Sequence, residues 1–107
     1  MLITQTTFHA RVERANRIRA LEEVLGFTKI VLEVPVVEDE ARYLLTSSGI
    51  IIVMNLYQDL LITAYMANID QCYRLYRMAG KSQISPKMFK RVVKNAERHP
   101  ELFLIRC

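Results

Sequence analysis

The chain has little glycine and little cysteine, two residues on which many small functional sites depend. Three glycines in 107 residues leave little material for a phosphate-binding loop. The two cysteines, Cys72 and Cys107, form no CxxC pair and have no histidine partner at metal-ligand spacing. This pattern argues against both a zinc site and a disulfide framework, so both cysteines are expected to be thiols.

Long apolar runs are also missing. The longest, GIIIVM from Gly49, stops at Asn55, well short of the roughly 18 residues that span a bilayer. The N-terminal stretch MLITQTTFHA lacks the positive and apolar regions of a secretory signal. We therefore expect a soluble cytoplasmic protein with no membrane partner. The length and the 51% apolar content suit a single packed domain over residues 1–107.

Several enzyme classes lack their local motifs. The sequence contains no GxGxxG, GxxxxGK[ST], GxSxG or HExxH pattern. Nucleotide cofactors, NTP hydrolysis, serine esterase chemistry and zinc proteolysis are therefore not indicated, and we expect neither a cofactor nor a metal. The chemistry that the sequence still allows is based on histidine, arginine, hydroxyls and backbone amides.

Charge is unevenly distributed although the net charge is only +4. Residues 1–19 carry four basic side chains against one acidic, residues 20–68 two against seven, and residues 69–107 nine against three. A basic surface made by the two ends would attract polyanions, because Lys and Arg neutralise phosphates and release counterions. RNA or DNA is thus the leading partner class. Solvated charged faces without a partner are the alternative, with about equal weight.

The hydrophobic pattern predicts a helix followed by strands. Apolar residues recur at three- and four-residue intervals from Phe8 to Leu25, which is typical of a helix, and Gly26 fits its C-terminal cap. TKIVLEVPVV (28–37) predicts a strand that Pro35 places at a sheet edge. Further strands are predicted at ARYLLT (41–46), GIIIVMN (49–55) and LLITAYMA (60–67). GIIIVM should be central, because it is apolar on both faces.

Two helices are predicted after the sheet. Asn68 and Gln71 have the spacing of a capping box, and Ser85 followed by Pro86 is typical of a helix start. The inward-facing residues expected in the two helices are Ile69, Cys72, Leu75, Tyr76, Ala79 and then Phe89, Val92, Val93, Ala96. The outer face of the last helix carries the predicted nucleic-acid-binding residues Lys87, Lys90, Arg91, Lys94 and Arg98. Tyr73 and Tyr76 would extend an RNA-tracking surface, or belong to the core.

The predicted fold class is α+β: an N-terminal helix, an antiparallel meander of about four strands, and two C-terminal helices. We expect the helices to pack on one face of the sheet and to leave the other face free for binding. A homodimer built through the GIIIVM strand is an alternative use of the sheet.

The stretch HARVERANRIR (9–19) holds one histidine and four arginines. Metal-independent RNA cleavage needs a base for the 2′-hydroxyl, an acid for the leaving 5′-oxygen and cations for the phosphorane. His9 can serve as base or acid because its ordinary pKa lies near working pH. Arg14 and Arg17 share a helix face and can hold one phosphate. Helix arginines that simply face solvent are the alternative.

The early helix with His9, Ala10, Arg14 and Arg17, the strand GIIIVM and the strand ending LITAY resemble the barnase, EndoU, colicin and RelE-like ribonuclease superfamily over residues 6–67. The closest likeness is to its uncharacterised bacterial and phage members. The resemblance implies a small metal-independent endoribonuclease of toxin or phage type, with its active site on the sheet face beside the first helix. An inhibitor protein is a further candidate partner.

The resemblance and the geometry of the last strand together give the candidate catalytic residues His9, Arg17, Thr63 and Tyr65. Arg14 and Arg42 are secondary candidates. Thr63 and Tyr65 are two apart on a strand and share a face. They would lie on the open side if Ile62, Ala64 and Met66 packed on the helices. Arg42 is alternatively a partner for Glu40. The first hypothesis is thus an RNA-directed endoribonuclease, and the second is a non-catalytic nucleic-acid- or protein-binding module.

Overall fold

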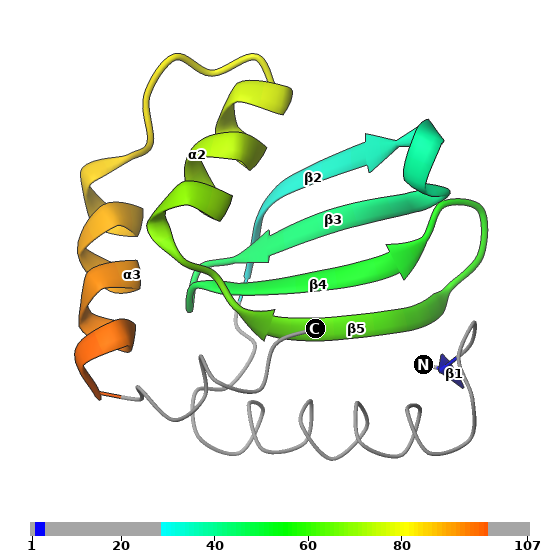
Figure 1. Cartoon of the computed structure of the whole chain (residues 1–107), viewed down its shortest axis with the longest axis horizontal. Coiled ribbons are helices and arrows are strands. Elements are labelled where there is room, and N and C mark those ends of the chain that lie inside the picture. The colour runs from blue at the N-terminus through cyan, green and yellow to red at the C-terminus, as the bar shows by residue number, and fades with distance from the viewer. Residues whose placement is uncertain (1, 4–28, 99–107) are drawn as a thin grey trace.

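The computed structural model describes residues 2–3 and 29–98, which form a five-stranded sheet and two α-helices (Figure 1). The elements are β1 (Leu2–Ile3), β2 (Ile30–Val36), the 3₁₀ turn η1 (Val37–Asp39), β3 (Ala41–Thr46), β4 (Ile50–Asn55), β5 (Leu60–Met66), α2 (Ile69–Met78) and α3 (Pro86–Arg98). The predicted α+β meander of four antiparallel strands followed by two helices is confirmed. The predicted N-terminal helix lies outside the described residues.

The strand order is β1-β5-β4-β3-β2. The strands β2 to β5 pair antiparallel with their neighbours in sequence, as short connections require, whereas β1 pairs parallel with β5. The strand β1 was not predicted, since two residues carry no periodicity. The strand β4 is central, as predicted from its apolar run, and is paired on both edges. A dimer built through this strand would have to open the sheet.

The turn between β3 and β4 depends on Gly49. The Gly49 amide donates to the Thr46 carbonyl over 3.0 Å, and the φ angle of Gly49 is +84°. This left-handed conformation favours glycine because it has no Cβ. The buried Thr46 hydroxyl also accepts a hydrogen bond from the Ile50 amide over 3.2 Å, which ties the two strands together at the turn.

Both faces of the sheet are buried. On one face, Leu45, Ile51 and Val53 pack with Leu75 of α2 and Val92 of α3. A second cluster lies on the other face and consists of Ile50, Ile52, Met54, Leu61, Ala64 and Met66. The prediction of a free sheet face is therefore wrong. The continuous apolar run in β4 already required cover on both sides, because side chains alternate between the two faces of a strand.

A β-bulge in β5 changes which residues share a face. Val53 pairs with Thr63 but Met54 pairs with Leu61, so Ile62 is an extra residue in the ladder. Ile62 consequently packs with the cluster beneath the helices, whereas strict alternation would have grouped it with Ala64. Thr63 lies opposite Val53 and therefore shares the face covered by α2, which corrects its predicted place on an open side.

Helix α2 begins as predicted at a capping box. The Gln71 amide donates to the Asn68 side chain over 2.8 Å, and the Asn68 amide donates to the Gln71 side chain over 2.9 Å. Cys72, Leu75 and Tyr76 form its buried stripe, while Ala79 is exposed. Cys72 is a free thiol, and burial raises its pKa to about 11.

The strand β2 lies at one edge of the sheet, as predicted from Pro35. Pro35 pairs in register with Arg42 of β3, and the ladder between β2 and β3 is irregular between Ile30 and Leu32. A proline is tolerated here because β2 is the last strand of the described sheet, so the missing N–H breaks no hydrogen bond with a further strand. Among the described residues, neither helix has the length and apolar character needed to cross a membrane.

Candidate nucleic-acid interface

Helix α3 is fixed at its start by Ser85. The Met88 amide donates to the Ser85 hydroxyl over 3.1 Å, and Pro86 occupies the first helical position, where its missing N–H is no loss. Met88, Val92 and Asn95 are its buried residues, spaced four and three apart along one stripe. The start predicted from Ser-Pro is confirmed.

The inward face predicted for α3 is partly wrong. Val92 is buried, but Phe89 and Val93 are 41% and 36% exposed, and Ala96 is exposed. Asn95 takes a buried place instead, because its side-chain amide donates to the Ser48 carbonyl over 2.7 Å. A hydrophobic pattern cannot assign a polar side chain to the core when the hydrogen bond that makes its burial favourable is with a distant residue.

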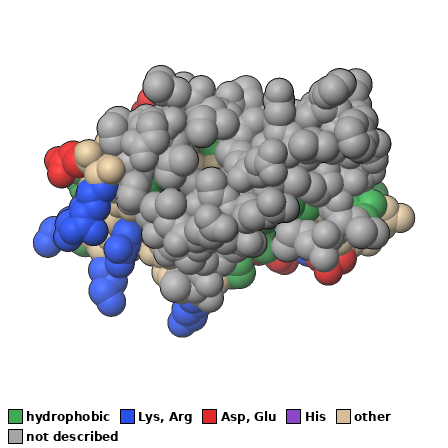
Figure 2. All heavy atoms as spheres, turned by 90° about the horizontal axis from the view of Figure 1, so that it is seen from below, with side chains coloured by type: hydrophobic (Ala, Val, Ile, Leu, Met, Phe, Trp, Pro, Cys, Tyr) green, Lys and Arg blue, Asp and Glu red, His purple; other side chains and the backbone are tan. Residues whose placement is uncertain are grey.

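The predicted basic residues of α3 are all exposed. Figure 2 shows Lys and Arg side chains projecting at the end of the molecule that α3 forms. Four of the five follow one another at spacings of four, three and four residues and therefore form one stripe along the helix. We call this set the α3 stripe: Lys87, Arg91, Lys94 and Arg98. At a rise of about 1.5 Å per residue, it is roughly 16 Å long.

A surface cleft adjoins the start of the α3 stripe. It has a volume of about 820 Å³ and lies between α3, the start of β2 and the β3–β4 turn. Its lining includes three cations, Lys29, Lys87 and Arg91, and three hydroxyls, Ser47, Ser48 and Ser85. Cations and hydroxyls are the groups that proteins place around phosphates. Lys29, from another part of the chain, thus extends the positive surface of α3.

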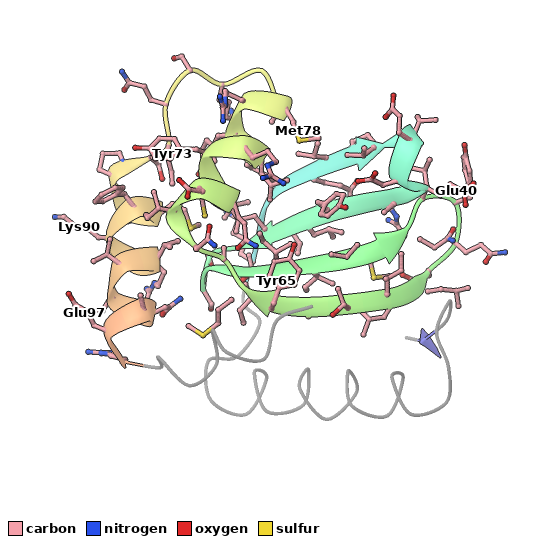
Figure 3. The ribbon with its side chains drawn as sticks, in the orientation of Figure 1. Glu40, Tyr65, Tyr73, Met78, Lys90 and Glu97 are labelled. Atoms are coloured by element: carbon pink, nitrogen blue, oxygen red, sulfur yellow. The ribbon has the colours of Figure 1, made fainter. Side chains whose placement is uncertain are left out.

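The predicted catalytic residues are not all in one place. His9, Arg14 and Arg17 lie outside the described residues. Tyr65 lines a small cavity of about 140 Å³ between the sheet and α2, together with Tyr43 and Arg74 (Figure 3 labels Tyr65). Thr63 is buried on the same face.

Arg42 lies on the opposite face of the sheet from Tyr65, because it pairs in register with Met54 of the second cluster. Its guanidinium donates to the carbonyls of Asn55 and Gln58, over 2.9 Å and 3.2 Å. The carboxylates of Glu33 and Asp59 each lie 3.9 Å from it, so its acidic partners are these two residues. Arg42 connects β3 to the β4–β5 turn, and it does not converge with Thr63 and Tyr65.

Sequence reasoning did not select Tyr43 or Arg74 for the cavity. Tyr43 of β3 pairs with Val53 of β4, and Tyr65 of β5 pairs with Ile51 of β4. Ile51 and Val53 are two residues apart and share a face of the sheet, so both tyrosines lie on that face. Strand alternation within the meander could have found this relation. The contribution of Arg74 depends on how α2 crosses the sheet, for which a helical pattern contains no information.

The phenol of Tyr43 is held in its protonated form. Its hydroxyl donates to the Asp39 carboxylate over 2.8 Å. Burial, and then this hydrogen bond and the negative charge of Asp39, raise the pKa of Tyr43 to about 12, against the opposing effect of Arg74. Tyr43 is therefore a poor general base at neutral pH.

Titration of the five tyrosines is expected to show one that ionises near pH 12. The folded-state pKa is raised above 10.0, so the associated stability is complete below pH 10 and is lost as pH rises to about 12. Tyrosinate absorbance measures the effect. Tyr43→Phe should remove the late component, and Tyr57→Phe, at an 80% exposed position, should leave it. If no tyrosine ionised near pH 12, the burial of Tyr43 and its contact with Asp39 would not persist in solution.

Comparison with protein-family models, with curated proteins and with solved structures found no match for this chain. Within residues 2–3 and 29–98, no group of three His, Cys, Asp or Glu side chains is placed to hold a metal ion.

Proposed function

We propose that the protein is RNA-directed and that the α3 stripe binds the sugar-phosphate backbone. The observation that carries the proposal is the alignment of four exposed cations on one face of a helix that is anchored to the sheet by the neighbouring buried stripe, Met88, Val92 and Asn95. An anchored helix holds its cations at fixed spacing, so less conformational entropy is lost when phosphates bind. The lysine and hydroxyls of the adjoining cleft add further groups suited to phosphate oxygens.

The sequence resemblance of residues 6–67 to small ribonucleases favours RNA over DNA in this proposal. The same surface would also attract an acidic protein, which is the other class of polyanion. The two differ in salt dependence, because nucleic acids release condensed counterions when phosphates are neutralised. Binding to RNA should therefore weaken much more steeply with salt.

The proposal is tested by the affinity for a labelled single-stranded RNA of mixed sequence, measured by fluorescence anisotropy between about 50 mM and 200 mM KCl. We expect the logarithm of the association constant to fall linearly with the logarithm of salt concentration. Four backbone contacts would contribute a slope of about −3 for a single strand. Absence of binding at the lowest salt would contradict the proposal.

A second candidate function is metal-independent cleavage of the bound RNA. The observation that favours it is a cavity lined by Arg74 and by the phenols of Tyr65 and Tyr43, in which Asp39 accepts the hydrogen bond of the Tyr43 hydroxyl. Arginine can stabilise charge on a phosphorane, and hydroxyls can orient the phosphate. In this proposal His9 transfers the proton, Arg17 and Arg14 hold the phosphate, and Thr63 and Tyr65 orient the substrate.

His9→Ala is expected to abolish cleavage while leaving the thermal unfolding curve unchanged. The experiment incubates both proteins with mixed cellular RNA in EDTA and identifies the product ends on a denaturing gel. Cleavage by the wild type alone, with 2′,3′-cyclic phosphate ends, is the expected result. Equal cleavage by His9→Ala would remove His9 from the mechanism. Intact RNA with both proteins would leave RNA binding as the function.

A further inference from the structure

A second groove lies between α2 and the start of α3. Two adjoining depressions, of about 540 and 430 Å³, share the lining residues Tyr73, Ser82, Gln83 and Ile84. One extends along α2 and the other continues to Pro86, Phe89 and Lys90 of α3. We call the two together the α2–α3 groove. Figure 3 shows Tyr73 between α2 and the start of α3, and Lys90 on the outer side of α3.

Two aromatic rings are exposed in the α2–α3 groove. Tyr73 is 40% exposed and Phe89 is 41% exposed, whereas Tyr76, only three residues after Tyr73, is 4% exposed. Burying Phe89 would have been favourable by about 2 kcal/mol, yet Asn95 occupies the buried stripe of α3 while Phe89 stays at the surface. The rings thus offer flat apolar faces that are not used by the core.

Cations surround the two rings. Arg74, Arg77 and Lys81 line the α2 side of the groove, and Lys90 lines the α3 side. Asp70 is the one acidic residue among the lining side chains. Aromatic faces bordered by Lys and Arg are the combination with which proteins bind unpaired nucleotides, since bases stack on the rings while the cations follow the backbone.

We infer that the α2–α3 groove binds single-stranded nucleic acid, with bases stacked on Tyr73 and Phe89 and the backbone held by Arg77, Lys81 and Lys90. This inference rests on the proposed function and adds to it a preference for unpaired over paired strands. A duplex keeps its bases stacked inside, so it can use the α3 stripe but not the rings. An apolar protein partner would also cover the rings, but the surrounding cations favour a polyanion.

The test compares Tyr73→Leu/Phe89→Leu with the wild type on two labelled probes, a single-stranded RNA and a duplex of the same length. Leucine keeps the surface apolar but removes the flat ring. We expect affinity for the single strand to fall about 30-fold or more, and affinity for the duplex to change less than about twofold. Tyr57→Leu is the matched control, since Tyr57 is exposed in the β4–β5 turn, and it should change neither affinity.

The outcomes separate this inference from the proposed function. If Tyr73→Leu/Phe89→Leu, with an unchanged unfolding curve, binds both probes as the wild type does, the groove is not a stacking site although RNA binding stands. An equal loss on both probes would also overturn the inference. If the wild type binds neither probe, the proposed function itself fails. Stacking has a second readout. The additional quenching of a 2-aminopurine label that accompanies binding of the strand to the wild type should disappear in the variant.

Discussion

Replacing all four residues of the α3 stripe by glutamine is expected to lower the affinity for single-stranded RNA about 10²–10³-fold at 0.1 M salt. The stripe consists of Lys87, Arg91, Lys94 and Arg98. Each neutralised phosphate makes the slope of log affinity against log salt concentration more negative by about 0.7. Relative to 1 M salt, one such contact therefore raises the affinity at 0.1 M roughly fivefold. The slope of the logarithmic salt plot should also become less negative by about three. Anisotropy titrations at several salt concentrations measure both quantities.

Two controls separate a site from general electrostatic attraction. Exchanging lysine for arginine and arginine for lysine throughout the stripe keeps every charge and should preserve the slope. Lys94→Gln and Gln58→Glu each lower the net charge by one unit, but Gln58 lies in the β4–β5 turn. Lys94→Gln should cost about fivefold in affinity and Gln58→Glu much less. Equal losses from both would show that only net charge matters.

Gly49→Ala is expected to destabilise the protein by about 3 kcal/mol. An alanine at a φ of +84° is strained, at a cost of about 1 kcal/mol. The new Cβ would also lie 2.7 Å from the side-chain nitrogen of Asn95, so this group would have to shift. Because Asn95 is buried, we expect the shift to weaken or break its hydrogen bond with the Ser48 carbonyl. A broken bond at a buried amide costs about 1–3 kcal/mol. Urea denaturation of the variant measures the change in unfolding free energy.

Gly80 provides the matched control for this substitution. Its φ of +79° is nearly the same, and a Cβ there would meet nothing within 4 Å. Gly80→Ala should therefore cost only the backbone term of about 1 kcal/mol. Combining Gly49→Ala with Asn95→Ala should cost less than the sum of the single changes, because the contact is then absent. Additive effects, or equal losses at the two glycines, would contradict the contact between α3 and the turn.

The elements of the described chain were predictable where local physics decides them. Asn68 with Gln71 and Ser85 with Pro86 satisfy helix amides by their own side chains, so sequence spacing alone locates both helix starts. The central position of β4 follows from its apolar run. Pro35 likewise indicates an edge, since it has no N–H to donate to a further strand on the side away from β3.

The features that escaped prediction depend on contacts between distant residues. The burial of Asn95 requires the Ser48 carbonyl, 47 residues away. The bulge at Ile62 has no marker such as glycine, and it changed the grouping of side chains on β5. The candidate sites show the same limit. The cations of α3 were identified by their residue type and spacing. The ring of Phe89 was wrongly assigned to the core, because the helix is turned about its own axis so that Asn95 faces inward and Phe89 faces solvent.

The outer edge of β2 resists extension of the sheet by a second molecule. Pro35 has no amide to donate, Glu33 puts a charge on this strand, and the irregular pairing near Ile30 distorts the ladder. If several copies were to crowd along one strand of RNA, their sheets would not merge into a continuous fibre. Neighbouring copies would therefore add no strand to one another along the β2 edge.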